Sequence, residues 1–294
     1  MEPKFVCLDV GGTQIKAAAI EKNGHLSAPI QFFPARSEEN AETILDHFTR
    51  IIRQVWEPEA VPEIRLAFPG PFDYEHGICL MQGLGKFDSL YGLDFGGELS
   101  RRLGVSREAI RFANDAAAFA LGELHFGAGK NASRALFVCI GTGCGSAFAV
   151  TGSLVSAPEP GVPENGWIYN TPFLGGQIDD FISRRGLLAL TKQYLGEALD
   201  GKALAHRALN GEKSAAACFH TFGERLRDAL TPFLDGFHPE VLCLGGQIVK
   251  SGSLFLEPLE MACLERGIRL AVTEDTSVRT LQGLTKVQQN SPHL

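Results

Sequence analysis

An apolar run interrupted by glycines occurs twice in this chain, and it constrains the fold more than any other feature. Residues 5–20 read FVCLDVGGTQIKAAAI, and residues 134–150 read RALFVCIGTGCGSAFAV. In both segments a strand pattern leads into a glycine-rich turn, and a second apolar run follows. The two segments form a weak internal repeat, about 130 residues apart. We therefore expect two similar domains, each beginning with a β-hairpin.

Length and periodicity agree with two domains of α/β structure. The chain has 294 residues, of which 45% are hydrophobic, enough for about two domains with sizeable cores. Strand and helix patterns alternate, with glycine-rich turns after strands, which is typical of folds whose ligand sites lie at strand ends. We predict helices over 41–55, 177–195 and 214–234, a strand over 63–68 and a long irregular loop over 151–176.

The charge and the cysteines limit the partners and the location. The net charge is −7 and no basic block occurs, which argues against nucleic acid and anionic membranes as partners. No stretch of 18 apolar residues and no signal-peptide pattern is present. The seven cysteines are scattered and form no CxxC, which indicates reduced, buried thiols. We expect a cytoplasmic protein without membrane or nucleic-acid partners.

The first turn contains an acid, two glycines and a lysine, namely Asp9, Gly11, Gly12, Thr13 and Lys16. Glycines let a backbone approach a phosphate closely and direct N–H groups at it. Asp9 could hold Mg²⁺, directly or through water. The spacing is neither that of a Walker A loop nor GxGxxG. A tight hairpin with a chance acid explains the same residues, and both interpretations stay open on the turn alone.

Two further glycine clusters follow strands. Gly141, Thr142 and Gly143 again expose backbone donors, although a glycine-rich hairpin is an equal alternative. Gly245 and Gly246 allow a flat ring or a helix to pack closely, and alone they are a weak signal. Two phosphate-facing turns in equivalent places of a repeat would clamp a nucleotide between two domains.

Asn114 and Asp115 precede the helix-forming run AAAFALGE. Both residue types are good helix N-caps, which is one explanation. The other is a carboxylate held at a helix N-terminus, where it accepts a proton from a hydroxyl nucleophile during phosphoryl transfer. In that role the helix dipole is expected to lower the pKa of Asp115 and keep it ionised.

These motifs resemble a known family. LDVGGTQIK, NDAAAFALGE, CIGTGCG and LCLGGQI follow one another in the order and spacing of the ROK family of repressors and sugar kinases, and the resemblance covers about residues 5–270. FPGPFD is similar to the family's sugar-side loop. The resemblance implies an α/β fold of two actin-like (ribonuclease H-like) domains with an interdomain cleft. The implied domains are 1–113, completed by 281–294, and 114–280.

The resemblance also implies roles for residues. It assigns ATP and Mg²⁺ binding to Asp9, Gly11, Gly12, Thr13, Lys16, Gly141, Thr142, Gly143, Gly245 and Gly246, with Asp9 as the magnesium residue. It assigns the sugar to Gly70, Asn114, Asp115, Glu164, Trp167 and Asp179, with Asp115 as the catalytic base. It further implies a homodimer.

The chain departs from the family where most members bind structural zinc. The family's ExGH and CxCGxxGCxE are replaced by PENGWIYNTPFLGGQIDDFIS. Glu164 matches the first acid, Trp167 stands in the place of the histidine, and Asp179 lies about where the last Glu would be. Four ligands are needed for a closed zinc site, and we expect no zinc. Trp167 could stack on a sugar or only pack the loop.

The leading hypothesis is an ATP-dependent, glucokinase-like hexose kinase that acts on the 6-hydroxyl. A DNA-binding repressor is disfavoured, because the family's repressors carry an N-terminal winged helix and here the first motif begins at Asp9. A catalytically silent sugar sensor remains an alternative, supported by the lost zinc motif. A kinase for an N-acetylhexosamine or a β-glucoside, or one that uses another phosphate donor, also remains open.

Overall fold

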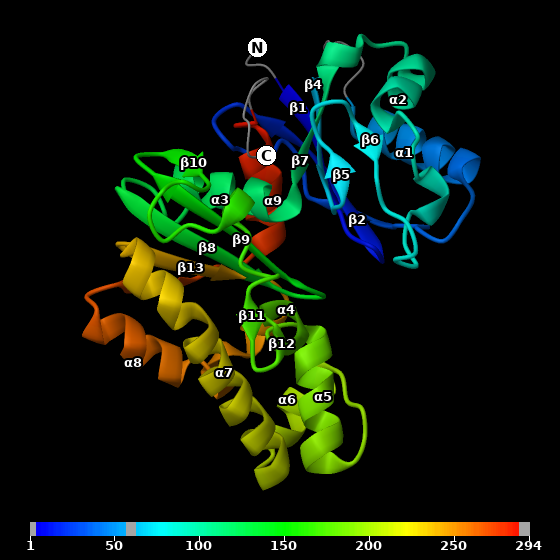
Figure 1. The fold of residues 1–294 in the computed structure, drawn as a ribbon. Coiled ribbons are helices and arrows are strands. Elements are labelled where there is room, and N and C mark those ends of the chain that lie inside the picture. The colour runs from blue at the N-terminus through cyan, green and yellow to red at the C-terminus, as the bar shows by residue number, and fades with distance from the viewer. Residues whose placement is uncertain (1–3, 57–62, 288–294) are drawn as a thin grey trace. The chain divides into compact units, whose positions relative to one another are not determined.

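The computed structural model describes residues 4–56 and 63–287, which form two compact units. Unit 1 comprises Met1–Phe126 and Ser277–Leu294, and unit 2 comprises Gly127–Thr276 (Figure 1). The helix that follows Asn114 belongs to unit 1, whereas the sequence placed a domain boundary before it. Of the segment 281–294 that was expected to complete the first domain, residues 288–294 lie outside the described residues.

Unit 1 is built on a five-stranded sheet with the order β3-β2-β1-β4-β7. β1, β2 and β3 pair antiparallel, and β4 and β7 extend the sheet in parallel with β1. The first predicted hairpin and the strand over 63–68 are confirmed. The strands are β1 (Lys4–Val10), β2 (Gln14–Glu21), β3 (Gln31–Pro34), β4 (Glu63–Phe68) and β7 (Ile110–Asn114).

The helices of unit 1 cover both faces of this sheet. Figure 1 shows α1 and α2 on one face and α3 and α9 on the other. α1 begins and ends where predicted, and Ile44, Phe48 and Ile52 are buried on its apolar face. The remaining elements are α1 (Ala41–Val55), β5 (Phe72–Asp73), β6 (Ile78–Cys79), the 3₁₀ turns η1 (Asp88–Leu90) and η2 (Arg107–Ala109), α2 (Phe95–Leu103), α3 (Asp115–Phe126) and α9 (Thr276–Leu284).

Helix α9, from the end of the chain, packs directly on α3. A Cβ added at Gly122 would lie 1.9 Å from the carbonyl oxygen of Arg279, and one at Gly283 would lie 1.8 Å from that of Ala118. Only glycines allow two helix backbones to approach so closely. The Arg279 guanidinium pairs with the buried carboxylate of Glu123 at 3.3 Å. The C-terminal helix is therefore an integral part of unit 1.

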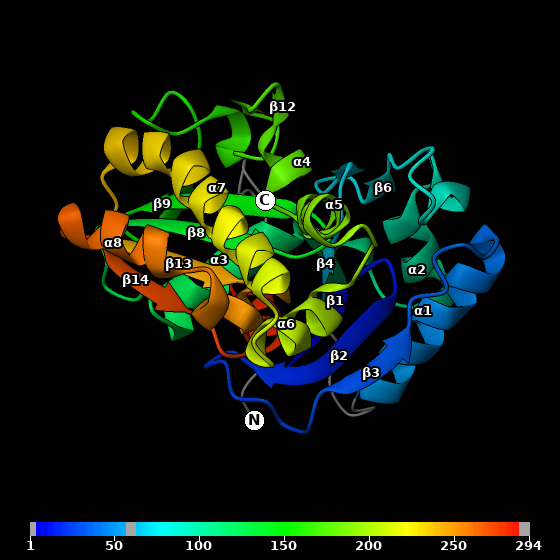
Figure 2. The ribbon, with the colours of Figure 1, turned by 90° about the horizontal axis from the view of Figure 1, so that it is seen from below.

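Unit 2 repeats the sheet topology of unit 1. Its strand order is β10-β9-β8-β13-β14, again with two antiparallel pairs followed by two parallel ones (Figure 2). The internal repeat seen in the sequence thus corresponds to two sheets of one pattern. The strands are β8 (Arg134–Ile140), β9 (Cys144–Val150), β10 (Ser153–Val155), β13 (Val241–Gly245) and β14 (Arg269–Val272).

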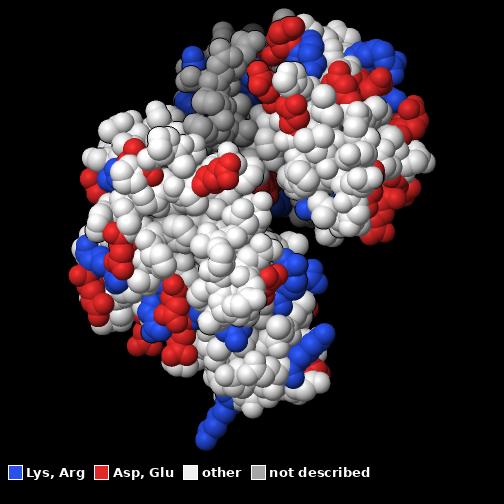
Figure 3. Space-filling model, viewed as in Figure 1, with Lys and Arg blue, Asp and Glu red and all other residues white. Residues whose placement is uncertain are grey.

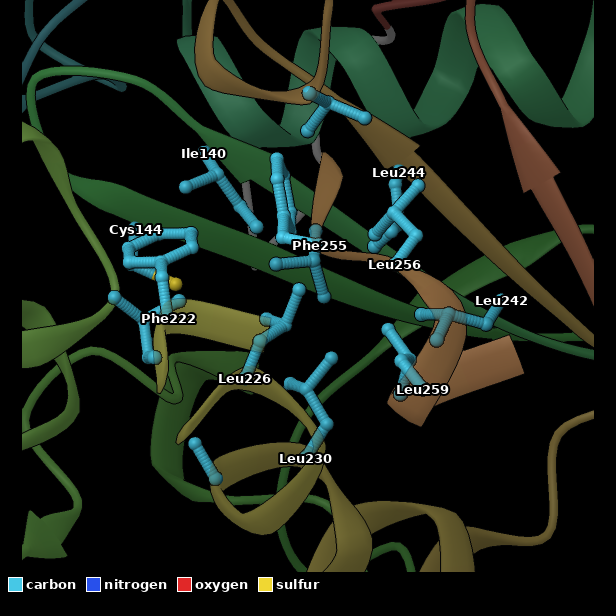
Figure 4. Close-up of a cluster of buried hydrophobic side chains, with 14 of the residues drawn as sticks. Ile140, Cys144, Phe222, Leu226, Leu230, Leu242, Leu244, Phe255, Leu256 and Leu259 are labelled. Carbon is cyan, nitrogen blue, oxygen red and sulfur yellow. The ribbon is translucent and has the colours of Figure 1, made fainter. Parts of the chain in front are cut away.

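The core of unit 2 lies between its sheet and α7. Figure 4 shows Phe222, Leu226 and Leu230 of α7 facing Leu242 and Leu244 of β13, and all five are fully buried. The helices, turns and small strands are η3 (Glu164–Gly166), β11 (Pro172–Phe173), β12 (Gly176–Gln177), α4 (Ile178–Phe181), α5 (Arg184–Leu195), α6 (Gly201–Leu209), α7 (Lys213–Phe237), η4 (Ile248–Leu254) and α8 (Glu257–Glu265).

Two sequence predictions for unit 2 need correction. The helix predicted over 177–195 is two helices, because the chain leaves the helical path at Ile182 and Ser183, whose hydroxyl caps α5. The predicted irregular loop over 151–176 contains β10 and the hairpin of β11 and β12. Helix α6 was not predicted, because the short segment 201–209 buries only Leu204 and gives a weak periodic signal.

The cysteines, the surface charge and the helix lengths can each be compared with what the composition predicted. All seven cysteines are free, and six are buried, which confirms the expected unpaired thiols. On the face drawn in Figure 3, basic and acidic side chains are interspersed rather than gathered into one basic patch. Across residues 4–56 and 63–287, no helix is both long and apolar enough to span a bilayer.

Candidate active site

The first glycine turn joins β1 to β2 and is tied down on both sides. The N–H of Gly11 donates to the carbonyl oxygen of Gln14 at 2.9 Å, and the Ser37 hydroxyl donates to the carbonyl oxygen of Gly12 at 2.6 Å. The N–H of Ala35 donates to the carbonyl oxygen of Thr13. These three hydrogen bonds hold the backbone of the turn in place.

The N–H groups of Gly12 and Thr13 have no acceptor within the described part of the chain. Neither Gly11 nor Gly12 has a positive φ, so the turn does not need glycine for its backbone conformation. A Cβ at Gly11 would press on the Gln14 carbonyl at 3.1 Å, and one at Gly12 would meet the Lys86 side chain at 3.3 Å. Glycine at position 11 is thus explained by packing within the turn. At position 12, the backbone N–H stays unpaired beside the Lys86 side chain.

Asp9 and Lys16 face each other across this hairpin. They are direct partners in the β1–β2 register, and Lys16 Nζ lies 2.9 Å from Asp9 Oδ2. Both side chains are partly buried. The pair places one carboxylate and one ammonium beside two free N–H donors, a donor set suited to Mg²⁺ and phosphate oxygens.

Asn114 and Asp115 stand at the end of β7, on the same sheet edge as Asp9. β1, β4 and β7 run parallel, so their carboxyl ends lie together. The Asn114 Oδ1 accepts from the N–H groups of Ala116 at 3.0 Å and Ala117 at 3.3 Å. The expected N-cap at Asn114 is therefore confirmed, and it fixes the start of α3, on which Asp115 sits.

The pKa of Asp115 is raised from its ordinary value of 3.8, not lowered as the helix dipole predicted. The side chain is exposed, yet surrounding protein disfavours its charged form, and the negative charge of Asp9 adds to this. The N–H of Ala116 and the charge of Lys86 oppose the shift without reversing it. The dipole argument failed because it omitted these two larger effects.

Tyr74, which directly follows the segment FPGPFD, orients Asn114. The Asn114 Nδ2 donates to the Tyr74 hydroxyl at 3.2 Å, and that hydroxyl donates to the carbonyl oxygen of Phe68 at 3.1 Å. A Cβ at Gly70 would lie 3.2 Å from the same hydroxyl. Burial raises the pKa of Tyr74, as does the charge of Asp115, so Tyr74 stays a neutral donor. Gly70 and Asn114 thus share one cluster with Asp115.

The second glycine turn, in unit 2, resembles the first. The N–H of Gly141 donates to the carbonyl oxygen of Gly143 at 2.9 Å, while the N–H groups of Thr142 and Gly143 have no acceptor among the described residues. Gly141 has no positive φ, and a Cβ there would meet nothing within 4 Å. Among the described residues, no steric contact therefore requires glycine at this position.

Asp179 lies against this second turn. Its Oδ1 accepts the N–H of Cys144 at 2.6 Å, and its other oxygen forms an ion pair with Arg185. A Cβ at Gly143 would lie 2.9 Å from Oδ1. One carboxylate oxygen is thus engaged by the backbone, so the orientation of Asp179 is fixed relative to Gly141 and Thr142.

Glu164 and Trp167 belong to a loop that Ser146 holds. The buried Ser146 hydroxyl donates to the carbonyl oxygen of Gly166 at 2.7 Å and accepts the N–H of Ile168 at 3.0 Å. Trp167, between them, is partly buried, and its ring centre lies 5.9 Å from that of Tyr169. Glu164 is exposed. Trp167 thus packs beside Tyr169 within the loop while part of its side chain remains exposed.

The rest of this loop is held by apolar contacts. Phe173 and Phe181 meet edge to face with ring centres 5.6 Å apart, and the Arg225 guanidinium lies 5.4 Å from the Phe181 ring. Ile168 and Ile178 are buried in the core of unit 2. No group of three or more His, Cys, Asp or Glu side chains in the described ranges is arranged to hold a metal ion.

We predict that chelation leaves the thermal stability of the free protein unchanged. Ser146, the Phe173–Phe181 contact and the buried isoleucines supply the loop contacts that structural zinc supplies elsewhere. The measurement is the melting temperature with and without EDTA, together with the zinc content of the purified protein. Stoichiometric zinc, or a melting temperature that drops with EDTA, would contradict the prediction.

Gly246 has a structural explanation of its own. Its φ is +101°, and a Cβ there would lie 2.2 Å from the carbonyl oxygen of Ile140. Its N–H donates to the Thr276 hydroxyl at 2.8 Å. Gly245 is the last residue of β13 and pairs with Cys139. The close approach of β13 to β8 accounts for Gly246 without any ligand, so its proposed contact with adenosine rests on the resemblance alone.

Sequence reasoning missed three residues in these clusters: Tyr74, Lys86 and Arg185. Tyr74 gave no signal, because its partner Asn114 is distant in sequence. Arg185 did give a sequence signal, because it lies only six residues after its partner Asp179, just beyond a helix-capping serine. Lys86 stands in the short segment GLGKF, where flanking glycines mark a loop.

The fold and these clusters define a class of protein. Two units of one topology, each with a glycine turn between its first two strands, form the actin-like fold of sugar kinases. The chain superposes on a ROK family glucokinase from Streptomyces griseus in complex with glucose and AMPPNP with a TM-score of 0.76 and 18% identity, over 96% of this chain and 98% of that one. At that identity the likeness establishes the fold.

The family follows from the sequence comparisons. The model of the ROK family matches residues 5–280, and the chain belongs to this family. It is 25% identical over 277 residues to a glucokinase from Thermotoga maritima, covering 87% of this chain and 86% of that protein. It is 27% identical over 259 residues to an N-acetyl-D-glucosamine kinase from Haemophilus influenzae, covering 81% and 82%.

Proposed function

We propose that this chain is an ATP-dependent sugar kinase that phosphorylates the 6-hydroxyl of a hexose. One observation supports this most. Asp9, the free N–H groups of Gly12 and Thr13, and the pair Asn114–Asp115 all lie at the carboxyl ends of neighbouring strands in one sheet. The glucokinase and N-acetyl-D-glucosamine kinase relatives support the reaction class.

The residues divide the reaction between them. Asn114, held by Tyr74, would position the sugar, and Asp115 would accept the proton of the attacking hydroxyl. The hydroxyl oxygen then forms a bond to the γ-phosphorus of ATP. The bond from that phosphorus to the β–γ bridging oxygen breaks, and ADP leaves with the electron pair. Phosphoryl transfer depends on such positioning and on stabilising charge.

The first turn fits a magnesium–nucleotide ligand. One Asp9 oxygen pairs with Lys16, and the other is available to Mg²⁺, which commonly binds one or two carboxylates plus phosphate oxygens. Bound there, the ion would neutralise charge between the phosphates. Gly12 and Thr13 would donate to phosphate oxygens, and in unit 2 the free donors are those of Thr142 and Gly143. Gly245 and Gly246 are assigned to adenosine on the resemblance.

We assign the choice of sugar to residues 164–179 of unit 2. Glu164 and Asp179 carry carboxylates that can accept from sugar hydroxyls, and Trp167 offers an aromatic face for a ring. Since Asp179 is already bonded to Cys144 and Arg185, its freedom to accept from a sugar is reduced. An N-acetylhexosamine or a β-glucoside is an alternative substrate. A homodimer remains a prediction from the family resemblance.

The test is a turnover assay with a panel of sugars. The 294-residue chain with Mg·ATP is offered glucose, fructose, mannose, N-acetylglucosamine, N-acetylmannosamine and a β-glucoside, and ADP release is followed. Polyphosphate and GTP replace ATP in parallel assays. Phosphorus NMR of the product identifies the hydroxyl that is phosphorylated. We expect turnover with one sugar and a 6-phosphate product.

A catalytically silent sugar sensor predicts a different pattern. One sugar would then raise the melting temperature, because a ligand that binds only the folded state stabilises it, while no sugar gives ADP release. That pattern would overturn the kinase proposal. A product phosphorylated at another hydroxyl would support a sugar kinase but show that the 6-hydroxyl is not the acceptor.

A further inference from the structure

Lys86 is a cation beside the first turn for which the sequence assigned no role. It lies between β6 and η1, and its side chain passes over Gly12, since a Cβ there would meet Lys86 Cδ at 3.3 Å and Cβ at 3.9 Å. Its ammonium has no carboxylate within ion-pair distance among residues 4–56 and 63–287. Its positive charge acts on Asp115, whose pKa it lowers. The lysine therefore lies beside the turn, and its charge acts on the proposed base.

The loop that carries Lys86 is fixed by its neighbours. The Asp88 carboxylate accepts from the N–H groups of Leu84 at 3.1 Å and Gly85 at 3.0 Å. The next residue, Phe87, is fully buried, and its ring lies 5.1 Å from that of Phe68. Lys86 is thus presented by an anchored backbone rather than by a freely moving one.

Ser37 connects this loop to the phosphate-facing turn. The N–H of Phe87 donates to the carbonyl oxygen of Ser37 at 2.6 Å, and the Ser37 hydroxyl donates to the carbonyl oxygen of Gly12 at 2.6 Å. Ser37 therefore links the backbone next to Lys86 to the backbone of the turn. A lysine with only a solubility role needs no such link.

The side chain is accessible to a ligand. Lys86 is partly buried and lines a surface pocket together with Ser37, Glu38, Gly85, Asp88 and Ser89. The lining of this pocket includes the acids Glu38 and Asp88 and not the turn. An anion would instead bind where the Lys86 side chain passes over Gly12, beside the free backbone N–H groups. The anion that the proposed reaction brings to this place is the terminal phosphate of the nucleotide.

We propose that Lys86 is a catalytic residue whose ammonium binds the phosphoryl group during its transfer from ATP to the sugar. The inference rests on the proposed function. The ammonium would hold the oxygens of the γ-phosphoryl while the new bond to the sugar oxygen forms and the bond to the ADP oxygen breaks. Charge that develops in the transition state is stabilised most by a cation already in place.

The test compares Lys86→Met with Lys22→Met. Methionine keeps most of the length of the side chain and removes the charge, and Lys22 is an exposed lysine of the same unit outside the site. We expect Lys86→Met to lower kcat by about 10²–10³-fold, the range seen when one transition-state donor is removed. The KM for the sugar should stay near that of the wild type, since the lost contact is to phosphate. Lys22→Met should leave both constants unchanged.

A binding measurement makes the result independent of turnover. Calorimetry with a non-hydrolysable ATP analogue and with ADP should show that Lys86→Met weakens the triphosphate about tenfold and ADP much less, because one charge-assisted contact is lost. Lys86→Arg should recover part of both effects. If the wild type phosphorylates no sugar, the proposed function fails, yet this comparison still tests Lys86.

Three results would overturn the inference. One is an unchanged kcat in Lys86→Met together with active wild type, which would leave the kinase proposal intact. Another is equal weakening of the triphosphate and of ADP. The third is a loss confined to the KM of a hexose that carries a carboxylate or phosphate, which would make Lys86 a determinant of an anionic sugar instead.

Discussion

Asp115→Asn is expected to lower the turnover of the best sugar by about a hundredfold or more, the range for removal of a general base. Asparagine has nearly the same shape and can still accept the N–H of Ala116, which the Asp115 Oδ1 accepts at 2.9 Å. It cannot take up a proton from the sugar hydroxyl. The measurement is kcat under saturating Mg·ATP and sugar, with the melting temperature recorded for both proteins.

The matched control is Asp46→Asn. Asp46 is an exposed carboxylate on α1 of the same unit, where it pairs with Arg102 at 2.5 Å, and surface pairs of this kind contribute little. Its change should leave kcat at the level of the wild type. If Asp115→Asn retained full turnover, Asp115 would not be the base, and the proposed mechanism would be wrong.

The same residue predicts the acid side of the pH profile. Because desolvation by the surrounding protein and the charge of Asp9 raise the pKa of Asp115, its carboxyl stays protonated to a higher pH than an ordinary aspartate. A base must be deprotonated, so kcat/KM should fall on acidification with an apparent pKa above the usual value of 3.8. A profile that stays flat down to the ordinary range of aspartate would contradict this shift.

Gly246→Ala is expected to destabilise unit 2 severely, by more than about 3 kcal/mol, because left-handed strain and overpacking add. Its φ is +101°, and the new Cβ would lie 2.2 Å from the carbonyl oxygen of Ile140, a backbone atom that cannot move away cheaply. The measurement is the midpoint of urea unfolding and its slope. Soluble protein with the midpoint of the wild type would show that the backbone relaxes at this position.

The matched comparison is Gly141→Ala, in the turn that follows Ile140. Here φ is not positive and the new Cβ meets no atom within 4 Å, so stability should be unchanged or raised by about 0.4–1 kcal/mol. If this turn binds phosphate, the methyl group would hinder its donors and raise the KM for ATP about tenfold. Unchanged stability with an unchanged KM would remove Gly141 from the nucleotide site.

The sequence by itself determined the plan of the molecule. The repeated apolar run with its glycine turn predicted both hairpins, because apolar periodicity and glycine act locally. For the same reason the boundaries of α1 and the cap at Asn114 could be predicted. The order and spacing of the motifs also indicated the ROK family, and the match over residues 5–280 confirmed it.

What only the tertiary structure decided depends on atoms that are distant in the chain. The charge of Asp9 and the surrounding protein raise the pKa of Asp115, which reversed the prediction from the helix dipole alone. Tyr74 reaches Asn114, and Lys86 reaches Gly12, across separations that leave no local pattern. The structure also showed that two glycines with similar sequence patterns differ in whether packing requires them. Gly246 is required by the close approach of two strands, whereas a Cβ at Gly141 would meet no atom of the described residues within 4 Å. A sequence records which residues are present, but their electrostatic and steric partners exist only once the strands have brought them together.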